Sequence, residues 1–462
     1  MAQTRETIAR REEARLHTEY EEVKRLILEG NLGLEKEMLR VTEDGHMSHS
    51  PHPFAQDEPN ITRDFCENQT EINTPIFRSA REVVDNLYEH TLRIQERLVN
   101  LQPRELLWPN SNPPYIRDED DIPVASFKGP QSQKTQYREY LSGRYGRYKM
   151  AFSGIHFNYS FSGELLRRNY EATTGIRIGK QWLKTPQDNP EIQEKTAAYR
   201  TYESQLYLRL ASLLDSYGWI MVVLTAASPL ADSSFVEKGH EGNDIYAGLA
   251  SFRCSELGYW NAFVPMLDYS TLDAYADSIQ HYVDLGWLKA PTELYYPVRL
   301  KPRGKNSLDN LRTGGINHIE LRMIDLNPLR KEGIEVKDVE FAQLLLGWLA
   351  ATPDNELDIV DPVMANVNYK NAAHYDLDTT SIHLSRSNSL SLREATLRVL
   401  GQMERFYRDI DSQKADVISY QQKKMTDADH YRYADLVKRK YADGFVSKTL
   451  ASLQPAQQPA HV

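Results

Sequence analysis

The sequence predicts an α+β fold in which helices surround a curved, largely antiparallel sheet with the functional site on its concave face. Strand-like segments with alternating polar and apolar residues occur throughout the chain, and helical runs such as 196–216 and 336–351 separate them. The composition, 40% hydrophobic and 26% charged over 462 residues, is typical of a folded globular protein. No internal repeat or Gly/Ser linker interrupts this pattern.

Because nothing in the sequence marks a boundary, we expect residues 1–450 to form one domain. Residues 1–30 are predicted to form a charged helix, and about 390–450 a group of charged helices. Residues 451–462 are polar and broken by proline, which predicts a flexible tail. The thin apolar stripe of the first helix consists of Ile8, Leu16, Val23, Ile27 and Leu28.

Charge and composition disfavour several classes of protein. A formal net charge of −10 disfavours a broad nucleic-acid surface, and the longest apolar run, 219–231, is too short to span a bilayer as a helix. The charged N-terminus has no secretory pattern. Two cysteines, Cys66 and Cys254, cannot build a disulfide scaffold and lack metal-site spacing. We therefore expect a cytoplasmic protein with neither nucleic-acid nor membrane partners, and its oligomeric state stays open.

The first two strand candidates carry acidic and histidine side chains on a polar face, because a strand directs residues i and i+2 to the same side. In GLEKEMLRV (33–41), Glu35 and Glu37 share one face. The other face of this segment carries Leu34, Lys36 and Met38. In SGIHFNYSF (153–161), His156 and Asn158 share the polar face. The opposite, apolar face carries Ile155, Phe157, Tyr159 and Phe161.

Two later candidates add cations. The polar face of ELYYPVRLKPR (293–303) carries Tyr295, Arg299 and Lys301. The polar face of GGINHIELRMIDLNP (314–328) carries His318, Glu320 and Arg322. If these strands pair with the first two, carboxylates and cations meet on one surface.

The segment ITRDFCENQTEINTP (61–75) fits either of two structures. As a strand it places Glu67, Gln69 and Glu71 on one face, and as a helix it aligns Asp64 with Glu67 and Glu71. Its proline and threonines favour the strand.

The ordinary explanation of these polar faces is a sheet with one solvated side. The charged side chains argue for a binding site instead, because such a cluster is costly to assemble unless something charged binds there. Oxygen ligands suit Mg²⁺. A histidine can join such a ligand set, and Mn²⁺ accepts it more readily than Mg²⁺ does. The sequence contains no zinc-binding motif. Neighbouring Arg and Lys would bind phosphate oxygens. The combination indicates phosphoryl transfer without a P-loop or GxGxxG motif.

Nine motifs in order resemble those of the bacterial glutamate–cysteine ligases, which are glutamine-synthetase-like ligases. They are GLEKEMLRV (33–41), ITRDFCENQTEINTP (61–75), LWPNSNPPYI (107–116), RYG (144–146), SGIHFNYSF (153–161), AASPL (226–230), FRCSELGY (252–259), ELYYPVRLKPR (293–303) and IELRMIDLNP (319–328). The resemblance implies that ATP activates the γ-carboxylate of L-glutamate as an acyl phosphate. The amine of L-cysteine then attacks it, forming γ-glutamylcysteine in the first step of glutathione synthesis.

The resemblance also implies roles for individual residues. It assigns more than one Mg²⁺ ion, which Mn²⁺ can replace, to Glu35, Glu37, Asp64, Glu71, His156 and Glu320. Glu320 and Arg322 are the implied catalytic pair, with Arg322 near the transferred phosphoryl group. The implied substrate contacts are Arg253 for a carboxylate, Tyr137, Tyr259, Tyr295, Phe65 and Leu141 for the cysteine pocket, and Asn158. The strand faces themselves add Arg299 and Lys301 as phosphate ligands.

Some features leave alternatives open. Met150 and Arg63 depart from the family pattern, which leaves room for another amine acceptor in specialised metabolism. A non-catalytic relative is the third possibility, although the complete set of six candidate ligands argues against it. His46, His49 and His52 lie among Ser and Pro, and we interpret them as an ordinary loop. We interpret the two cysteines as buried side chains, with a redox switch as the alternative.

Overall fold

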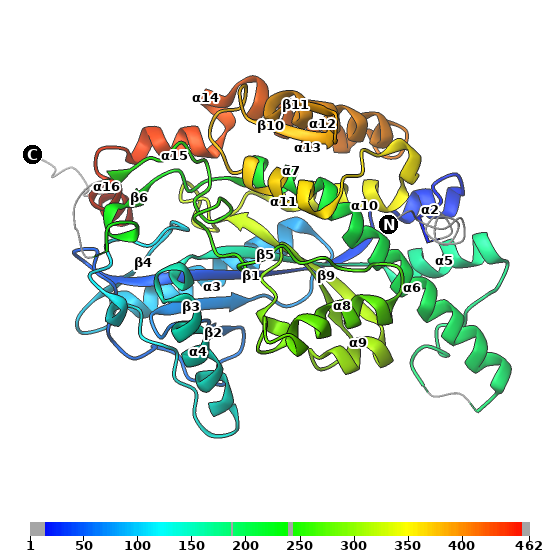
Figure 1. Ribbon diagram of the computed structural model, residues 1–462, viewed down its shortest axis with the longest axis horizontal. Coiled ribbons are helices and arrows are strands. Elements are labelled where there is room, and N and C mark those ends of the chain that lie inside the picture. Colours follow the sequence, from blue (N-terminus) through cyan, green and yellow to red (C-terminus); the bar gives the residue numbers. More distant parts are fainter. Residues whose placement is uncertain (1–13, 186–187, 239–243, 455–462) are drawn as a thin grey trace, which may run out of the picture.

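The computed structural model describes residues 14–185, 188–238 and 244–454. A seven-stranded sheet lies at its centre (Figure 1), with strand order β2-β3-β1-β5-β9-β8 and with β4 beside the far end of β1. The strands are β1 (Gly30–Thr42), β2 (Ile61–Arg63), β3 (Gln69–Asn73), β4 (Glu105–Leu107), β5 (Gly154–Phe161), β8 (Val298–Pro302) and β9 (Ile316–Asp325). Every pairing within this sheet is antiparallel, which confirms the predicted fold class.

The register of the sheet brings distant parts of the sequence into line. Glu35 of β1 lies opposite His156 of β5, and Glu37 lies opposite Glu71 of β3. On the other side of β5, Glu320 of β9 lies between Asn158 of β5 and the edge strand β8. Because side chains alternate across each strand, this register gathers the polar residues on one face.

Helices and two small hairpins surround the sheet. The helices are α2 (Glu21–Leu26), α3 (Ala80–Val99), α4 (Ser132–Tyr145), α5 (Gly163–Thr174), α6 (Pro190–Tyr217), α7 (Trp219–Thr225), α8 (Leu272–Asp284), α9 (Leu308–Gly314), α10 (Val336–Ala351), α11 (Pro362–Asn371), α12 (Leu392–Arg408), α13 (Ala415–Thr426), α14 (Ala428–Tyr431), α15 (Tyr433–Tyr441) and α16 (Phe445–Leu453). The hairpins are β6 (Ala231–Asp232) with β7 (Asp244–Ile245), and β10 (Ser381–Ser385) with β11 (Asn388–Ser391).

The apolar face of the sheet packs against α3, α6, α7 and α10. Phe157, Ile319 and Leu321 are fully buried there, as the alternation predicts. Among the described residues no single helix is long and apolar enough to cross a membrane. The helices α6 and α7, which meet at a bend of 56°, reach that length and apolar content only when they are taken together.

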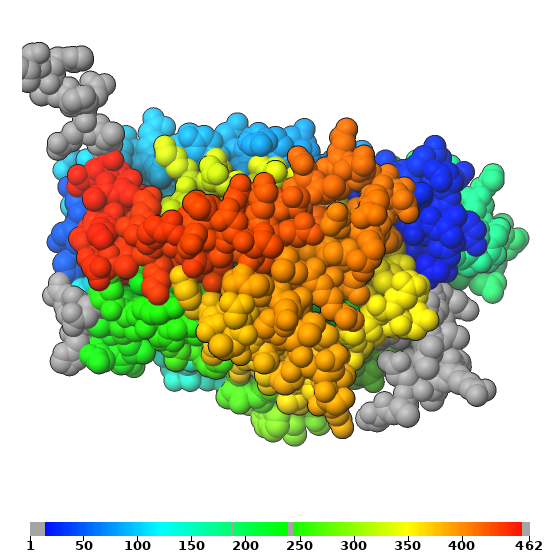
Figure 2. All heavy atoms as spheres, turned by 90° about the horizontal axis from the view of Figure 1, so that it is seen from above, coloured from blue at the N-terminus to red at the C-terminus, as the bar shows by residue number. Residues whose placement is uncertain are grey.

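The C-terminal helices α12 to α15 form the outermost layer on the upper side of Figure 1, beyond α7, α10 and α11. Seen from above, this segment runs across the molecule (Figure 2). A buried ion pair ties the layer to the core: Lys424 of α13 lies 2.7 Å from Asp338 of α10, which also accepts a hydrogen bond from Tyr433 of α15. Neither charge is accessible to water, so each depends on the other.

Several of the sequence predictions are corrected. Residues 1–13 of the predicted helix, and with them Ile8, lie outside the described residues, and the rest forms only α2 before β1 begins at Gly30. Segment 61–75 is neither one strand nor a helix, because β2 and β3 are joined by a turn. In this turn the side chain of Asn68 donates hydrogen bonds to the carbonyls of Ser48 and Asp121. The predicted strand at 293–303 begins only at Val298, since Pro297 has no amide hydrogen to donate.

Residues 455–462 of the predicted flexible tail lie outside the described residues. The first residues of that tail belong to α16, which continues to Leu453. Leu450 and Leu453 pack against the apolar cluster that contains Trp108 and Phe445, so packing extends the helix into a segment whose composition predicts a tail.

Candidate active site

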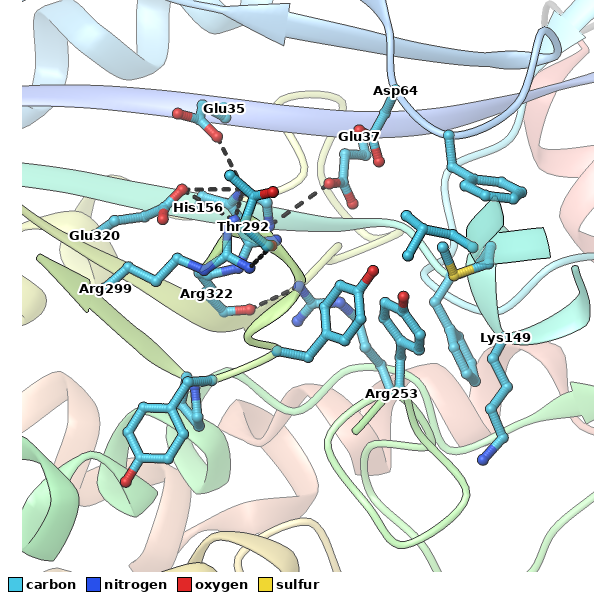
Figure 3. A pocket seen from close by; sticks show the side chains of 18 of the residues that line it. Glu35, Glu37, Asp64, Lys149, His156, Arg253, Thr292, Arg299, Glu320 and Arg322 are labelled. Carbon is cyan, nitrogen blue, oxygen red and sulfur yellow. Dashed lines mark hydrogen bonds and ion pairs between the residues drawn. The ribbon is translucent and has the colours of Figure 1, made fainter. Parts of the chain in front are cut away.

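The polar face of the sheet opens into a cavity of about 450 Å³ between the strands, α4 and the loops at 253–260 and 292–297. Figure 3 shows its labelled charged residues converging from separate elements. The residues proposed from the sequence that line it are Glu35, Glu37, Asp64, Phe65, Glu71, Tyr137, Leu141, His156, Arg253, Tyr259, Tyr295, Arg299, Lys301, Glu320 and Arg322.

His156 lies at the centre of the acidic cluster (Figure 3). Its Nδ1 lies 2.9 Å from Glu35 Oε2 and 3.7 Å from Glu320 Oε1, and its Nε2 lies 3.6 Å from Glu37 Oε1. Three possible metal-ligand atoms, one each from Glu35, His156 and Glu320, lie within 4.8 Å of one another. This is the one such group among the described residues, and its spacing suits a single cation.

A second set of carboxylates extends the cluster along β1 toward β3. Glu37, Asp64 and Glu71 line the same cavity, and the amide of Gly154 donates to Glu37 Oε2 at 3.2 Å. Burial and the negative charges of Asp64 and Glu35 raise the pKa of Glu71 well above its ordinary range. Burial likewise raises the pKa of Glu37. These two carboxyls are therefore protonated more readily than carboxyls in water, and a cation bound between them would favour their ionised form.

Cations complete the opposite side of the cluster. Arg322 Nη1 lies 3.0 Å from Glu320 Oε1, and Lys301 Nζ lies 3.1 Å from Glu320 Oε2. Burial alone would raise the pKa of Glu320, but these two cations outweigh it and hold the carboxyl ionised, with its pKa below the ordinary value. Arg299 donates instead to the carbonyls of Thr292, at 3.1 Å, and Leu294, at 2.7 Å.

Arg253 reaches the cavity because a glycine faces it. Its Nη2 donates to the carbonyl of Arg322 at 2.7 Å, and its Nη1 to that of Ile324 at 3.4 Å. A Cβ atom at Gly154 would lie 2.4 Å from the guanidinium carbon of Arg253. The first residue of β5 must therefore be glycine for the arginine to adopt this position.

Aromatic side chains form the wall at the other end of the cavity. The rings of Tyr259 and Tyr295 are in contact, with centroids 3.9 Å apart. Thr292 Oγ1 donates to Tyr137 Oη across 3.3 Å, which links this wall to α4. Phe65 and Leu141 add apolar surface, so this end of the cavity is suited to a small, partly apolar side chain.

The structure separates other residues from the cavity. Asn158 does not line it, but its Nδ2 donates to Glu35 Oε1 at 3.0 Å. Glu67 points away from the cavity. Both the strand and the helix considered for segment 61–75 placed it on the same face as Glu71. It accepts hydrogen bonds from the amides of His52 and Ser126, and its Oε2 lies 3.4 Å from Arg63 Nε.

The loop histidines do not converge. His46 pairs with Asp44, at 3.2 Å, and His49 with Asp121, at 2.8 Å. Cys66 and Cys254 are both buried free thiols, as expected.

Several cavity residues were not predicted from the sequence. They include Lys134, Arg138, Lys149, Phe152, Thr292 and Trp260. Arg138 of α4 donates to the carbonyl of Asp64 at 2.5 Å and so supports the turn that carries this carboxylate. Lys149 lies across the cavity from the acidic cluster in Figure 3. No strand pattern includes these residues, although Lys149 follows the RYG motif closely in the sequence.

Asp325, the last residue of β9, connects the motif at 226–230 to the site. Its carboxylate accepts hydrogen bonds from Ala227 N, Ser228 Oγ and Ser251 Oγ, at 3.0, 2.7 and 3.0 Å. Ser251 Oγ in turn accepts from the amide of Cys254 at 3.2 Å. The end of β9 thus anchors the loop from which Arg253 extends.

Comparisons with known proteins give one consistent result. A family model described as glutamate-cysteine ligase matches residues 16–287 and 265–372. The chain is 31% identical over 437 residues to the glutathione biosynthesis bifunctional protein GshAB of Listeria monocytogenes, covering 92% of this chain and 54% of that protein. It is 31% identical over 395 residues to a glutamate–cysteine ligase of Clostridium acetobutylicum, covering 75% and 77%.

The fold is similar to that of a solved structure, the glutamate–cysteine ligase of Francisella tularensis in complex with AMP. The TM-score is 0.75 at 21% identity, over 92% of this chain and 87% of that one. This chain spans about half the length of the bifunctional curated relatives that it matches.

Proposed function

The chain belongs to the glutamate–cysteine ligase family, and from that membership we propose that it joins L-glutamate to L-cysteine with ATP. The products would be γ-glutamylcysteine, ADP and phosphate, in the first step of glutathione biosynthesis. The observation that carries the proposal is the cavity itself. A carboxylate–histidine cluster with cations beside it occupies one end, and an aromatic wall closes the other.

The donor set fits hard divalent cations, because it consists of carboxylate oxygens with one imidazole nitrogen. Glu35, His156 and Glu320 would hold one ion, and the carboxylates of Glu37, Asp64 and Glu71 would hold others. Bound Mg²⁺ or Mn²⁺ supplies positive charge that reduces the repulsion between the substrate carboxylate and the triphosphate.

The side chains of the protein would bind and orient the reactants. Arg322 and Lys301, on the neighbouring strands β9 and β8, would bind phosphate oxygens, and Arg299 would join them by exchanging its carbonyl partners. Arg253 would bind a substrate carboxylate. A γ-carboxylate oxygen of glutamate then bonds to the γ-phosphorus of ATP as the bond to ADP breaks. The amine nitrogen forms the amide as phosphate leaves, and the amine proton passes to solvent.

A chromatographic assay with ATP, Mg²⁺, glutamate and cysteine tests the proposal. We expect γ-glutamylcysteine and an equal amount of ADP. No ADP release with any amine acceptor would contradict the proposal and would favour a non-catalytic relative.

A second candidate keeps the γ-glutamyl phosphate chemistry but uses another amine acceptor in specialised metabolism. Met150, which lies in the cavity wall and is almost fully buried, keeps this alternative open because it departs from the family pattern. Turnover compared across a panel of amines separates the two candidates, since a preference for an amine without a thiol would select the second.

We also propose that the enzyme works in the cytoplasm, where reducing conditions suit the free thiols of Cys66 and Cys254. Fractionation of cells with an antibody to the chain would test this, and recovery outside the cytoplasmic fraction would contradict it.

A further inference from the structure

The RYG motif at 144–146 has no role in the site described so far. It ends α4, where Gly146 adopts φ +75° in the left-handed region and stops the helix. The two residues before it, Arg144 and Tyr145, both contact Glu293 in the turn before Tyr295. The motif therefore connects a helix to a part of the chain about 150 residues away.

Glu293 is completely buried, and three protein groups contact its carboxylate. Arg144 Nε lies 3.0 Å from Oε1, and Tyr145 Oη donates to the same oxygen at 2.7 Å. The amide of Lys289 donates to Oε2 at 2.5 Å. A buried carboxylate with this many donors is held in one orientation.

Asn261 extends the network to the aromatic wall. Its Nδ2 donates to the carbonyl of Glu293 at 3.0 Å, and its Oδ1 accepts from the amide of Tyr295 at 2.8 Å. Asn261 also follows Tyr259 by two residues. The network thus links the backbone next to Tyr259 to the backbone at Tyr295.

The ring of Tyr145 supports the pair directly. It meets Tyr259 edge-on, with centroids 5.6 Å apart and planes at 89°, and it meets Tyr295 at 5.6 Å and 86°. Edge-to-face contacts of this kind fix the tilt of both rings. Tyr259 and Tyr295 line the cavity, whereas Tyr145, Glu293 and Asn261 do not.

We propose that Glu293, together with Arg144, Tyr145 and Asn261, is a set of positioning residues that holds Tyr259 and Tyr295 and so determines the affinity and selectivity for the amine acceptor. This inference rests on the proposed function. It gives the RYG motif a role in acceptor recognition without contact with any substrate.

Glu293→Gln is the first test. The amide keeps the size of the side chain but removes the charge that pairs with Arg144 and cannot accept the same hydrogen bonds. We expect the KM for cysteine to rise about tenfold or more, while the KM for ATP and kcat at saturating cysteine change by less than about twofold. Selectivity for cysteine over L-2-aminobutyrate, in which a methyl group replaces the thiol, should fall.

Two further variants complete the design. Tyr145→Phe removes only the hydroxyl and keeps both ring contacts, so it should give a smaller change in the same direction even if Glu293→Gln fails to fold. Glu203→Gln is the matched control, because Glu203 is also buried and pairs with an arginine, Arg303, at 2.9 Å, but lies outside the cavity. It should alter neither KM nor selectivity.

The outcomes separate the two proposals. A wild-type protein that forms γ-glutamylcysteine, with Tyr145→Phe and Glu293→Gln variants that keep its KM for cysteine and its selectivity, overturns the positioning role and leaves the proposed function standing. The positioning role is also overturned if the KM values for all three substrates rise together. A wild-type protein without ligase activity contradicts the proposed function itself.

Discussion

The charged side chains on the two faces of the central strand β1 have different surroundings. Glu35 and Glu37 face the cavity, where His156 bridges them and more carboxylates surround them. Lys36, between them in sequence, faces the core and is 2% exposed. Its ammonium group donates to two neutral acceptors, Thr91 Oγ1 at 3.1 Å and a main-chain carbonyl at 2.9 Å.

This difference shows that the surroundings, rather than the type of residue, decide the state of a charge in this protein. Burial lowers the pKa of Lys36 to about 7, although the negative charge of Glu332 opposes part of this shift. Arg322 is only partly buried; burial would lower its pKa, but Glu320 and other carboxylates raise it above the ordinary value. On the cavity face, cations hold Glu320 ionised, whereas on the core face burial disfavours the charge of Lys36.

The largest expected effect comes from removing a carboxylate on the cavity face. Glu35→Ala should reduce ADP formation below detection in an assay with ATP, Mg²⁺, glutamate and cysteine, because it removes a member of the tightest donor group. Glu43→Ala, just beyond β1 and largely exposed, is the control and should behave as wild type. If Glu35→Ala releases ADP at the wild-type rate, the reaction does not need Glu35, and the proposed role of the cavity face of β1 is wrong.

Shortening the cation beside the cluster should come next. Arg322→Lys keeps the charge but loses the forked donor geometry, and we expect kcat to fall by about 10²–10³-fold. Steady-state kinetics with saturating substrates measures this. Arg312→Lys, on the surface and paired with Asp277 at 2.7 Å, serves as the control. If both variants keep the wild-type kcat, Arg322 does not act on the reacting phosphate.

A smaller effect is expected from Gly154→Ala. The added Cβ would displace the Arg253 guanidinium, and a shift of this size costs up to about 10²-fold in activity. The loss should appear mainly as a higher KM for the substrate whose carboxylate Arg253 binds. Gly163→Ala is the control, because its added Cβ would meet nothing. Unchanged KM values for all substrates would show that Arg253 binds none of them.

The smallest effect concerns stability and tests the core face. The unfolded chain keeps the Lys36 proton up to its ordinary pKa of 10.5, whereas the folded protein releases it near pH 7. Wild-type stability should therefore gain a contribution from this residue as the pH rises from about 7 to 10.5. Lys36→Met should raise the free energy of unfolding below pH 7 by at least about 1 kcal/mol, because one pKa unit corresponds to about 1.4 kcal/mol, and it should remove that contribution. Urea denaturation between pH 6 and pH 9 measures both, and an unchanged pH dependence in Lys36→Met would contradict this interpretation.

Much of the fold and of the cluster could be predicted from local sequence pattern. Alternation in 33–41 and 153–161 placed Glu35, Glu37 and His156 on one face, because a strand allows only two directions for its side chains. The same reasoning brought Glu320 and Arg322 onto that face. The helices at 196–216 and 336–351 also lie where their apolar content predicts them, within α6 and as α10.

The tertiary structure decided what no local period encodes. The turn between β2 and β3 directs Asp64 into the cavity and Glu67 away from it, because the buried hydrogen bonds that Asn68 donates fix the path of the chain. Glu293 and Tyr145 come together in the same way, from segments that have no common period and meet only when the chain folds. Sequence alternation determines which side of a strand a residue occupies, whereas loop positions follow from packing and hydrogen bonds between distant segments.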